Sequence, residues 1–253
     1  MSPPILDLAL AAAAGLIGGA MNALAGGGTF ATMPTLIALG LPSPVANATS
    51  NVALLPGAAT SAWGFRDELK PVGGVSLRLL CGVTFVAGLA GSALLVATPS
   101  SAFDRIVPWL LLIAFIAILF GKQGADWLRG RVTIDARTLI AAQAMLGVYG
   151  GYFGGGVGIM TTATYGLLAG ETPRSLFAPR TLMLAIANLA AAFVFVGAGL
   201  IVWSLCLPML AGGVAGGWLG ARYGKRLPTW AVRAWTILVT ATTTVVFFWR
   251  AYG

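Results

Sequence analysis

The feature that most constrains the fold of this chain is a series of long apolar stretches. They run over residues 6–24, 75–97, 106–120, 182–202 and 230–249. A helix that spans a bilayer needs about 20 mostly apolar residues, so these stretches predict membrane-spanning helices. Only 9% of the residues are charged, whereas soluble domains carry about 25%. The sequence therefore predicts an all-α integral membrane protein and excludes a water-soluble fold.

Two glycine-rich motifs occur twice along the chain, at one fixed spacing. The run Gly15-Leu-Ile-Gly-Gly, followed by Ala25-Gly-Gly-Gly-Thr29, is echoed by Gly147-Val-Tyr-Gly-Gly and then Phe153-Gly-Gly-Gly-Val157. The run 87–91 is echoed by 215–220 at the same offset of 128 residues. A constant offset over this distance indicates an internal repeat. We predict a first membrane repeat over 1–121, a cytoplasmic linker over 122–136 and a second membrane repeat over 137–253.

Each repeat is predicted to contain about five helical segments, the second of them short. This segment lies between the glycine triplet and a proline-marked turn, over 30–40 in the first half and 158–169 in the second. As a helix, 30–40 would be about 16 Å long, against a hydrocarbon core of about 30 Å. Paired short or glycine-interrupted segments are typical of transporter binding sites. The sequence leaves open whether they cross the membrane or re-enter it.

The distribution of Lys and Arg predicts how the chain is oriented in the membrane. Basic residues gather in the loops around 66–78 and 122–137 of the first half and 222–233 of the second, whereas the turns near 98–104 and 197–200 carry few. Basic loops are cytoplasmic as a rule. The pattern reverses between the halves, which predicts inverted-topology repeats in the plasma (inner) membrane with both termini outside the cytoplasm. The net charge of +8 is therefore an orientation signal and predicts no nucleic-acid partner.

Several chemistries are excluded by missing residue types and motifs. The chain has no histidine, no Walker A motif and no GxSxG nucleophile elbow, so we predict that it is not an enzyme and that it has neither metal nor cofactor. All seven acidic residues fall in or beside predicted loops or termini, which argues against proton coupling through a membrane carboxylate. An inside-negative potential can drive an anion outward without any coupling ion. We therefore expect an exporter of a small anion.

The candidate site is predicted around the two glycine triplets. One interpretation of the triplets is close helix packing; the other is an unwound strand of N–H groups beside a helix N-terminus, which can hold an anion. Because each triplet precedes a short segment, we favour the second. The predicted residues are Gly26, Gly27, Gly28 and Thr29 in the first half, and Gly154, Gly155 and Gly156 in the second.

Polar residues that follow the short segments complete the prediction. Asn47, Ser50 and Asn51 are spaced to share one helix face, where they could bind a ligand; helix capping is the alternative, and suits Asn47 best. In the second half Arg180 lies six residues beyond Arg174, deeper than snorkelling to the headgroups requires. We expect Arg180 to contact the anion, with hydroxyls supplied by Thr161, Thr162 and Thr181.

At these residues the sequence resembles the TauE/SafE family of membrane proteins, also called the sulfite exporter family. The resemblance covers nearly the whole chain and rests on 15–19, 25–29 and 46–51 and on the repeated 147–156. It implies transport of sulfite, thiosulfate, sulfonates or related organic anions. An anion channel of the same architecture and a non-transporting accessory subunit remain as alternatives, and the sequence leaves a homo-oligomer open. The predicted partners are a small anionic substrate and the lipid bilayer.

Overall fold

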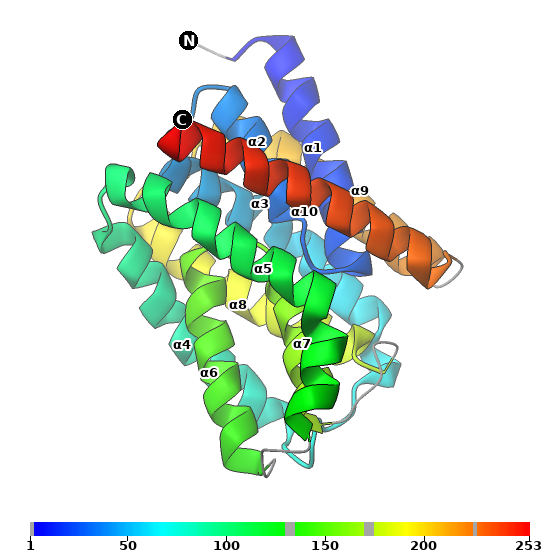
Figure 1. The fold of residues 1–253 in the computed structure, drawn as a ribbon. Helices are drawn as coiled ribbons and strands as arrows, with labels where there is room; N and C mark the ends of the chain where they lie inside the picture. Colours follow the sequence, from blue (N-terminus) through cyan, green and yellow to red (C-terminus); the bar gives the residue numbers. More distant parts are fainter. Residues whose placement is uncertain (1–2, 130–134, 170–174, 225–226) are drawn as a thin grey trace.

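The computed structural model describes residues 3–129, 135–169, 175–224 and 227–253, and the described chain is helical throughout its length apart from short turns (Figure 1). The predicted all-α fold is confirmed. The side chains of 121–129, 224 and 229 lie outside the description. The helices of the described residues are α1 (Ile5–Leu24), α2 (Thr29–Ala38), α3 (Ser43–Gly64), the 3-10 turn η1 (Arg66–Glu68), α4 (Leu77–Ala97), α5 (Ser100–Arg129), α6 (Ala136–Tyr152), α7 (Val157–Ala169), α8 (Phe177–Gly197), α9 (Trp203–Gly224) and α10 (Thr229–Tyr252).

Helix length and composition fit a membrane protein. Within the described residues, six helices are long and apolar enough to cross a bilayer, namely α1, α4, α5, α8, α9 and α10. Two short apolar helices, α2 with 10 residues and α7 with 13, begin directly after the glycine triplets, as predicted. Helix α3 is long enough to span but carries a polar cluster in its first half. The order of long and short helices is thus the same in α1–α5 and in α6–α10.

Two glycine seams join the halves of the chain to each other. Helix α1 lies along α9, and α4 lies along α6. A Cβ added at Gly15 would collide with the carbonyl of Met209, and one added at Gly216 would collide with that of Leu16. In the second seam a Cβ at Gly151 would meet the carbonyl of Gly88. Small residues let helix backbones approach closely at both seams. Because each seam joins a helix of one half to a helix of the other, the helices of the two halves are interleaved.

The remaining helices pack around these seams. Helix α3 packs against α8 and α9, and α8 also packs against α4. Helices α5 and α10 contact each other and lie across the front of the bundle in Figure 1, with α7 beside α5. Helix α1 begins and α10 ends toward the upper end of that view. The short helices α2 and α7 are therefore enclosed by longer ones.

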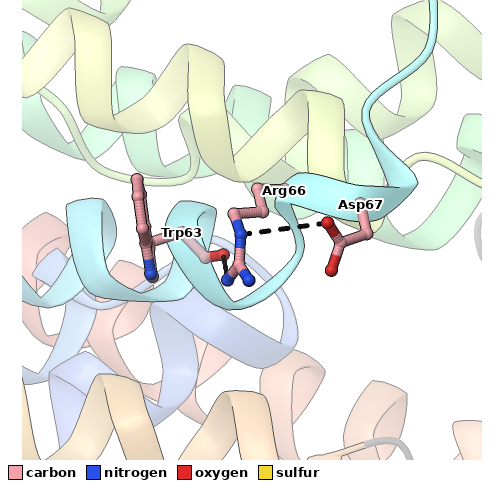
Figure 2. Close-up of polar contacts among 3 residues, drawn as sticks. All are labelled: Trp63, Arg66 and Asp67. Atoms are coloured by element: carbon pink, nitrogen blue, oxygen red, sulfur yellow. Dashed lines mark hydrogen bonds and ion pairs between the residues drawn. The ribbon is translucent and has the colours of Figure 1, made fainter.

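The C-terminal end of α3 has the chemistry of a membrane–water interface (Figure 2). The guanidinium of Arg66 lies 4.9 Å from the ring centroid of Trp63 and donates a hydrogen bond to the Trp63 carbonyl at 3.2 Å. Arg66 Nε is also 3.8 Å from a carboxylate oxygen of Asp67. The Trp63 side chain is 70% exposed. Exposed tryptophan paired with a basic residue is typical of the headgroup region.

A second pair of this kind lies at the end of α9. The guanidinium of Arg222 is 5.1 Å from the ring centroid of Trp218. A Cβ added at Gly64, the last residue of α3, would lie 3.8 Å from the Cβ of Ala221. The C-terminal ends of α3 and α9, each with a tryptophan–arginine pair, are therefore neighbours at one end of the bundle.

Candidate functional site

The first glycine triplet breaks the chain between α1 and α2. Helix α1 ends at Leu24, and Gly26 has a φ of +86°, a conformation that favours glycine. The N–H of Gly28 donates to Asn22 Oδ1 at 2.6 Å, which ties the triplet back to the last turn of α1. Thr29 then begins α2 and is buried. The local fold thus presents the N-terminus of a short helix inside the protein.

The second triplet repeats this arrangement between α6 and α7. Gly154 and Gly156 have φ values of +73° and +77°, and Val157 begins α7. Among the described residues, no acceptor is found for the N–H groups of Gly155, Gly156 and Val157. Successive unpaired N–H groups at a helix N-terminus form an anion-binding concavity.

The two triplets meet in the interior. A Cβ added at Gly26 would collide with the Cα of Gly158 in the first turn of α7. The Phe30 ring lies against both triplets, since a Cβ at Gly27 and one at Gly156 would each come within 3.0 Å of it. All six triplet glycines are buried. The structure therefore brings both predicted glycine sites together, with the N-termini of α2 and α7 adjacent.

The polar cluster of α3 faces this region. Asn47 Nδ2 donates to the carbonyl of Tyr152 at 3.1 Å, and Asn51 Nδ2 donates to that of Phe153 at 3.4 Å. Ser50 Oγ lies 2.5 Å from Thr32 Oγ1 on α2. All three predicted residues of the cluster are fully buried, which agrees with a shared helix face.

The alternative prediction, that Asn47 caps a helix, is wrong. Helix α3 begins at Ser43 and its N-cap residue is Pro42, with no side-chain cap hydrogen bond. Proline fixes a φ that suits the start of a helix, so Pro42 and Pro44 define the N-terminus one turn earlier than the polar cluster. Asn47 is consequently free to bind the end of α6.

Arg180 is buried within α8, with only 5% of its surface exposed, so it does not snorkel to the headgroups. Its Nη2 donates to the carbonyls of Ala23 at 3.0 Å and Leu24 at 2.6 Å, and its guanidinium lies 4.3 Å from the ring centroid of Phe177. Arg180 Nε has no partner among the described residues. The cation therefore lies beside the last turn of α1, directly before the first triplet. Arg174 lies outside the described residues.

The same device occurs in both halves. The last carbonyls of a helix have no partner within that helix, and the helix end carries a partial negative charge. At α1 the donor is Arg180 of α8, and at α6 the donors are Asn47 and Asn51 of α3. In each case a polar side chain from the third helix of one half donates to the carbonyls at the end of the first helix of the other half, just before the glycine triplet.

The three predicted threonines differ in what their hydroxyls do. Thr162 donates to the carbonyl of Gly158 at 2.8 Å, and Thr181 donates to that of Phe177 at 2.6 Å, so both are satisfied within their own helices. Thr161 Oγ1 is buried and has no partner among the described residues. The side-chain oxygens of Asn47 and Asn51 are likewise buried without a described partner. These atoms remain available to a ligand.

Asn22 and Thr32 are among the residues that contact the site but were absent from the sequence prediction. Asn22 accepts from Gly28, and Thr32 contacts Ser50 and donates to the Gly28 carbonyl at 3.2 Å. Both are polar residues in otherwise apolar segments close to the triplet, which is the signal that could have found them.

The electrostatic character of the site is positive. Arg180 is the one charged side chain that is buried among the described residues. Asp7, Asp67, Glu68, Asp104 and Asp135 are exposed or half-buried, while Glu171 and the side chain of Asp126 lie outside the described residues. A buried cation near two helix N-termini favours an anionic ligand.

A multi-pass helical bundle in which two interrupted segments meet at a buried polar site has the architecture of a membrane transporter. The chain belongs to the family described as sulfite exporter TauE/SafE, whose model matches residues 11–247. The resemblance predicted from the glycine motifs is thereby confirmed, and the protein is a membrane transporter of this family.

Curated relatives agree with this assignment. The chain is 29% identical to a "Probable membrane transporter protein" of Haemophilus influenzae over 220 residues, which cover 85% of this chain and 84% of the relative. It is 28% identical to "Probable membrane transporter protein YfcA" of Escherichia coli over 213 residues, covering 84% and 77%. "Probable membrane transporter protein ORF9" of a Sinorhizobium species is 28% identical over 221 residues, covering 85% and 82%. No solved structure matches the chain significantly.

Proposed function

We propose that this protein is a secondary transporter that exports a small sulfur-containing or organic anion, such as sulfite, thiosulfate or a sulfonate, across the inner membrane. The observation that carries the proposal is the buried charge of Arg180 beside the point where the two glycine triplets meet. A cation at that depth is costly unless it serves a ligand or a partner. The family assignment supports transport, and the chemistry of the site supports an anion.

Binding would proceed by replacement of the hydration shell of the anion. The unpaired N–H groups of Gly155, Gly156 and Val157 supply neutral donors. Arg180 supplies a charged one, and each hydrogen bond to a charged group contributes about 1.5 to 3 kcal/mol. Thr161 adds a hydroxyl, which suits an oxyanion with several acceptor oxygens. We also assign Thr29, Ser50, Thr162 and Thr181, together with the first triplet, to the substrate site.

The closed state of this region favours a carrier over a channel. The triplets, the α3 cluster, Thr161, Arg180 and Thr181 are buried, and Thr162 is half-buried. Two surface hollows of the protein include none of the predicted site residues. An anion would reach the site only after helices move, as alternating access requires. Export follows the membrane potential, which contributes about 2.3 kcal/mol per charge per 100 mV.

Reconstitution in liposomes tests the proposal. Purified protein should release preloaded thiosulfate or sulfite with saturation, faster when the inside is negative, and should show counterflow of labelled substrate. Conductance without saturation or counterflow would establish a channel instead. Vesicles that release no tested anion faster than empty vesicles would contradict transport by this protein alone, as expected of an accessory subunit.

We also propose that residues 1–121 and 137–253 are inverted repeats joined by 122–136, although α5 extends as a helix to Arg129. The packing supports a two-fold repeat, because exchanging α1–α5 with α6–α10 converts the α1–α9 contact into α6–α4 and the α3–α9 contact into α8–α4, which are both present. The neighbouring C-terminal ends of α3 and α9 also fit basic loops on one side.

Cysteine labelling tests the inverted topology. Single cysteines at Ser100 and Ala198, both exposed, should react with an impermeant reagent from outside the cell, in a background without the native cysteines. Ala198 is chosen over Gly199 because Gly199 has a φ of +68°. Labelling of only one of the two from outside would support a parallel arrangement and contradict the proposal.

A further inference from the structure

A surface hollow lies where the first turns of α5 meet the last turns of α10. Its volume is about 220 Å³, and its walls are Ser101, Asp104, Arg105, Phe247, Arg250 and Ala251. A volume of this size holds several water molecules. That is enough for one small oxyanion, and none of the lining residues belongs to the proposed transport site.

The hollow carries more positive than negative charge. Arg105 and Arg250 are exposed and Asp104 is half-buried. Among the described residues the only ion pair is that of Arg66 with Asp67, so neither arginine forms an ion pair with a described carboxylate. The N–H of Ser101, in the first turn of α5, also has no acceptor among the described residues. Two free guanidinium groups and a helix N-terminus thus converge on one small volume.

The elements that form the hollow are held together by an aromatic cluster. Tyr252 OH donates to the carbonyl of Arg105 at 2.9 Å, and Trp109 Nε1 donates to Tyr252 OH at 3.0 Å. The ring centroids of Trp109 and Phe248 are 5.2 Å apart. These contacts fix the backbone of Arg105 relative to the C-terminal turn that carries Arg250.

Exposed aromatic residues near the hollow indicate its depth in the membrane. Trp109, Trp249 and Tyr252 are 53%, 77% and 57% exposed. Exposed tryptophan and tyrosine at helix ends mark the level of the lipid headgroups. Exposed apolar side chains, among them Ile106 and Ile113, continue along α5 toward the interior of the bilayer. A lipid chain could lie along this surface while its phosphate occupies the hollow.

We propose that this hollow binds the phosphodiester of a membrane phospholipid between Arg105 and Arg250. Two arginines and one aspartate leave a net charge of +1, which matches the single negative charge of a phosphodiester. Arg binds phosphate in bidentate fashion, and basic pockets between membrane helices bind lipid headgroups. The carboxylate of Asp104 can accept a hydrogen bond from the ammonium or hydroxyl group of the headgroup. The bound lipid would hold α5 against α10 at this end of the bundle.

Native mass spectrometry of the full-length protein tests the site. The purified protein is titrated with dioleoyl phosphatidylethanolamine and with dioleoyl phosphatidylglycerol, each with and without excess inorganic phosphate. The double variant R105Q/R250Q removes both guanidinium groups from exposed positions. R78Q is the matched control, because Arg78 is also exposed but lies at the start of α4 and does not line the hollow. Thermal unfolding checks that all three proteins are folded.

We expect the double variant to bind at least one of the two lipids about a hundredfold more weakly, at about tenfold per arginine. R78Q should bind as the unchanged protein does, and inorganic phosphate should not displace the lipid. Equal lipid binding by R105Q/R250Q and R78Q would overturn the proposal. Displacement of the lipid by inorganic phosphate, or loss of phosphate binding alone in the double variant, would show that the hollow takes a soluble oxyanion and would overturn the lipid assignment.

Discussion

Replacement of Arg180 by glutamine removes the buried charge of the proposed site and shortens the side chain, so that its amide does not extend to the position of the guanidinium nitrogens. In the structure Arg180 Nη2 donates to the carbonyls of Ala23 and Leu24 at the end of α1. The substitution therefore has two separate effects. It weakens the contact between α8 and α1, and it removes a charged donor from the neighbourhood of the first triplet.

The two effects have different magnitudes. The shorter amide leaves the carbonyls of Ala23 and Leu24 without this donor, and each buried polar group that loses its partner costs about 1 to 3 kcal/mol of stability. The anion loses the charged donor altogether, which weakens binding about tenfold to a hundredfold. The anion affinity of the Arg180→Lys variant should lie between those of R180Q and the unchanged protein, because lysine keeps the charge but lacks the planar guanidinium.

The assay separates these effects. Thiosulfate binding is measured by titration calorimetry, export is measured in proteoliposomes, and thermal unfolding is measured on the same preparations. We expect R180Q to remain folded with a lower melting temperature and to lose binding and export together, while R78Q matches the unchanged protein. If R180Q melts earlier but binds and exports normally, Arg180 only caps α1. The reasoning that places the anion beside it would then be refuted.

Three further predictions concern the breaks and caps of the helices. Gly26→Ala should destabilise the protein far more than Gly40→Ala. Both positions have positive φ, so a Cβ causes about 1 to 2 kcal/mol of backbone strain at each. Only the Cβ added at Gly26 would also collide with backbone atoms, whereas no atom lies within 4 Å of one added at Gly40. Asn47→Ala should cost about 1 to 3 kcal/mol in thermal unfolding, because a buried carbonyl loses its donor. The side-chain hydrogen bond from Thr138 lowers the pKa of the Asp135 carboxyl. Asp135→Ala should therefore lower the melting temperature at neutral pH, and the difference should vanish as the pH falls through that lowered pKa; a pH-independent difference would contradict this.

Much of the fold could be predicted because glycine and proline mark the ends of helices. The triplets at 26–28 and 154–156 mark where α2 and α7 begin, as observed, whereas the turn predicted after α7, at 170–173, lies outside the described residues. The pairing of α1 with α9 and of α4 with α6 could not be predicted. The hydrophobic pattern identifies helical segments and their apolar faces. In a bilayer, however, any apolar face can lie against lipid. Which helices pair therefore depends on how well their surfaces fit together.

The candidate site was predicted in its location but not in its hydrogen bonds. The depth of Arg180 followed from its position along α8. Its carbonyl partners on α1 did not, because they depend on a contact between residues more than 150 positions apart. For Asn47 the competing local signal was the expected helix start, which Pro42 and Pro44 had already fixed. Local patterns thus determine where a polar side chain lies along its helix, whereas the fold determines what it meets.

The glycine seam between α1 and α9 has a consequence for synthesis of the protein. The partner of α1 is α9, which begins at Trp203, 179 residues after the end of α1 at Leu24. The ribosome must therefore synthesise these residues before α9 can form. At about 5 to 20 residues per second, α1 waits roughly 10 to 35 seconds in the membrane before α9 can cover it. Lipid or the insertion machinery must shield its glycine face during that interval. If the gene were divided between the halves, the two products would have to be inserted close together in the same membrane, because each supplies the seam partner that the other lacks.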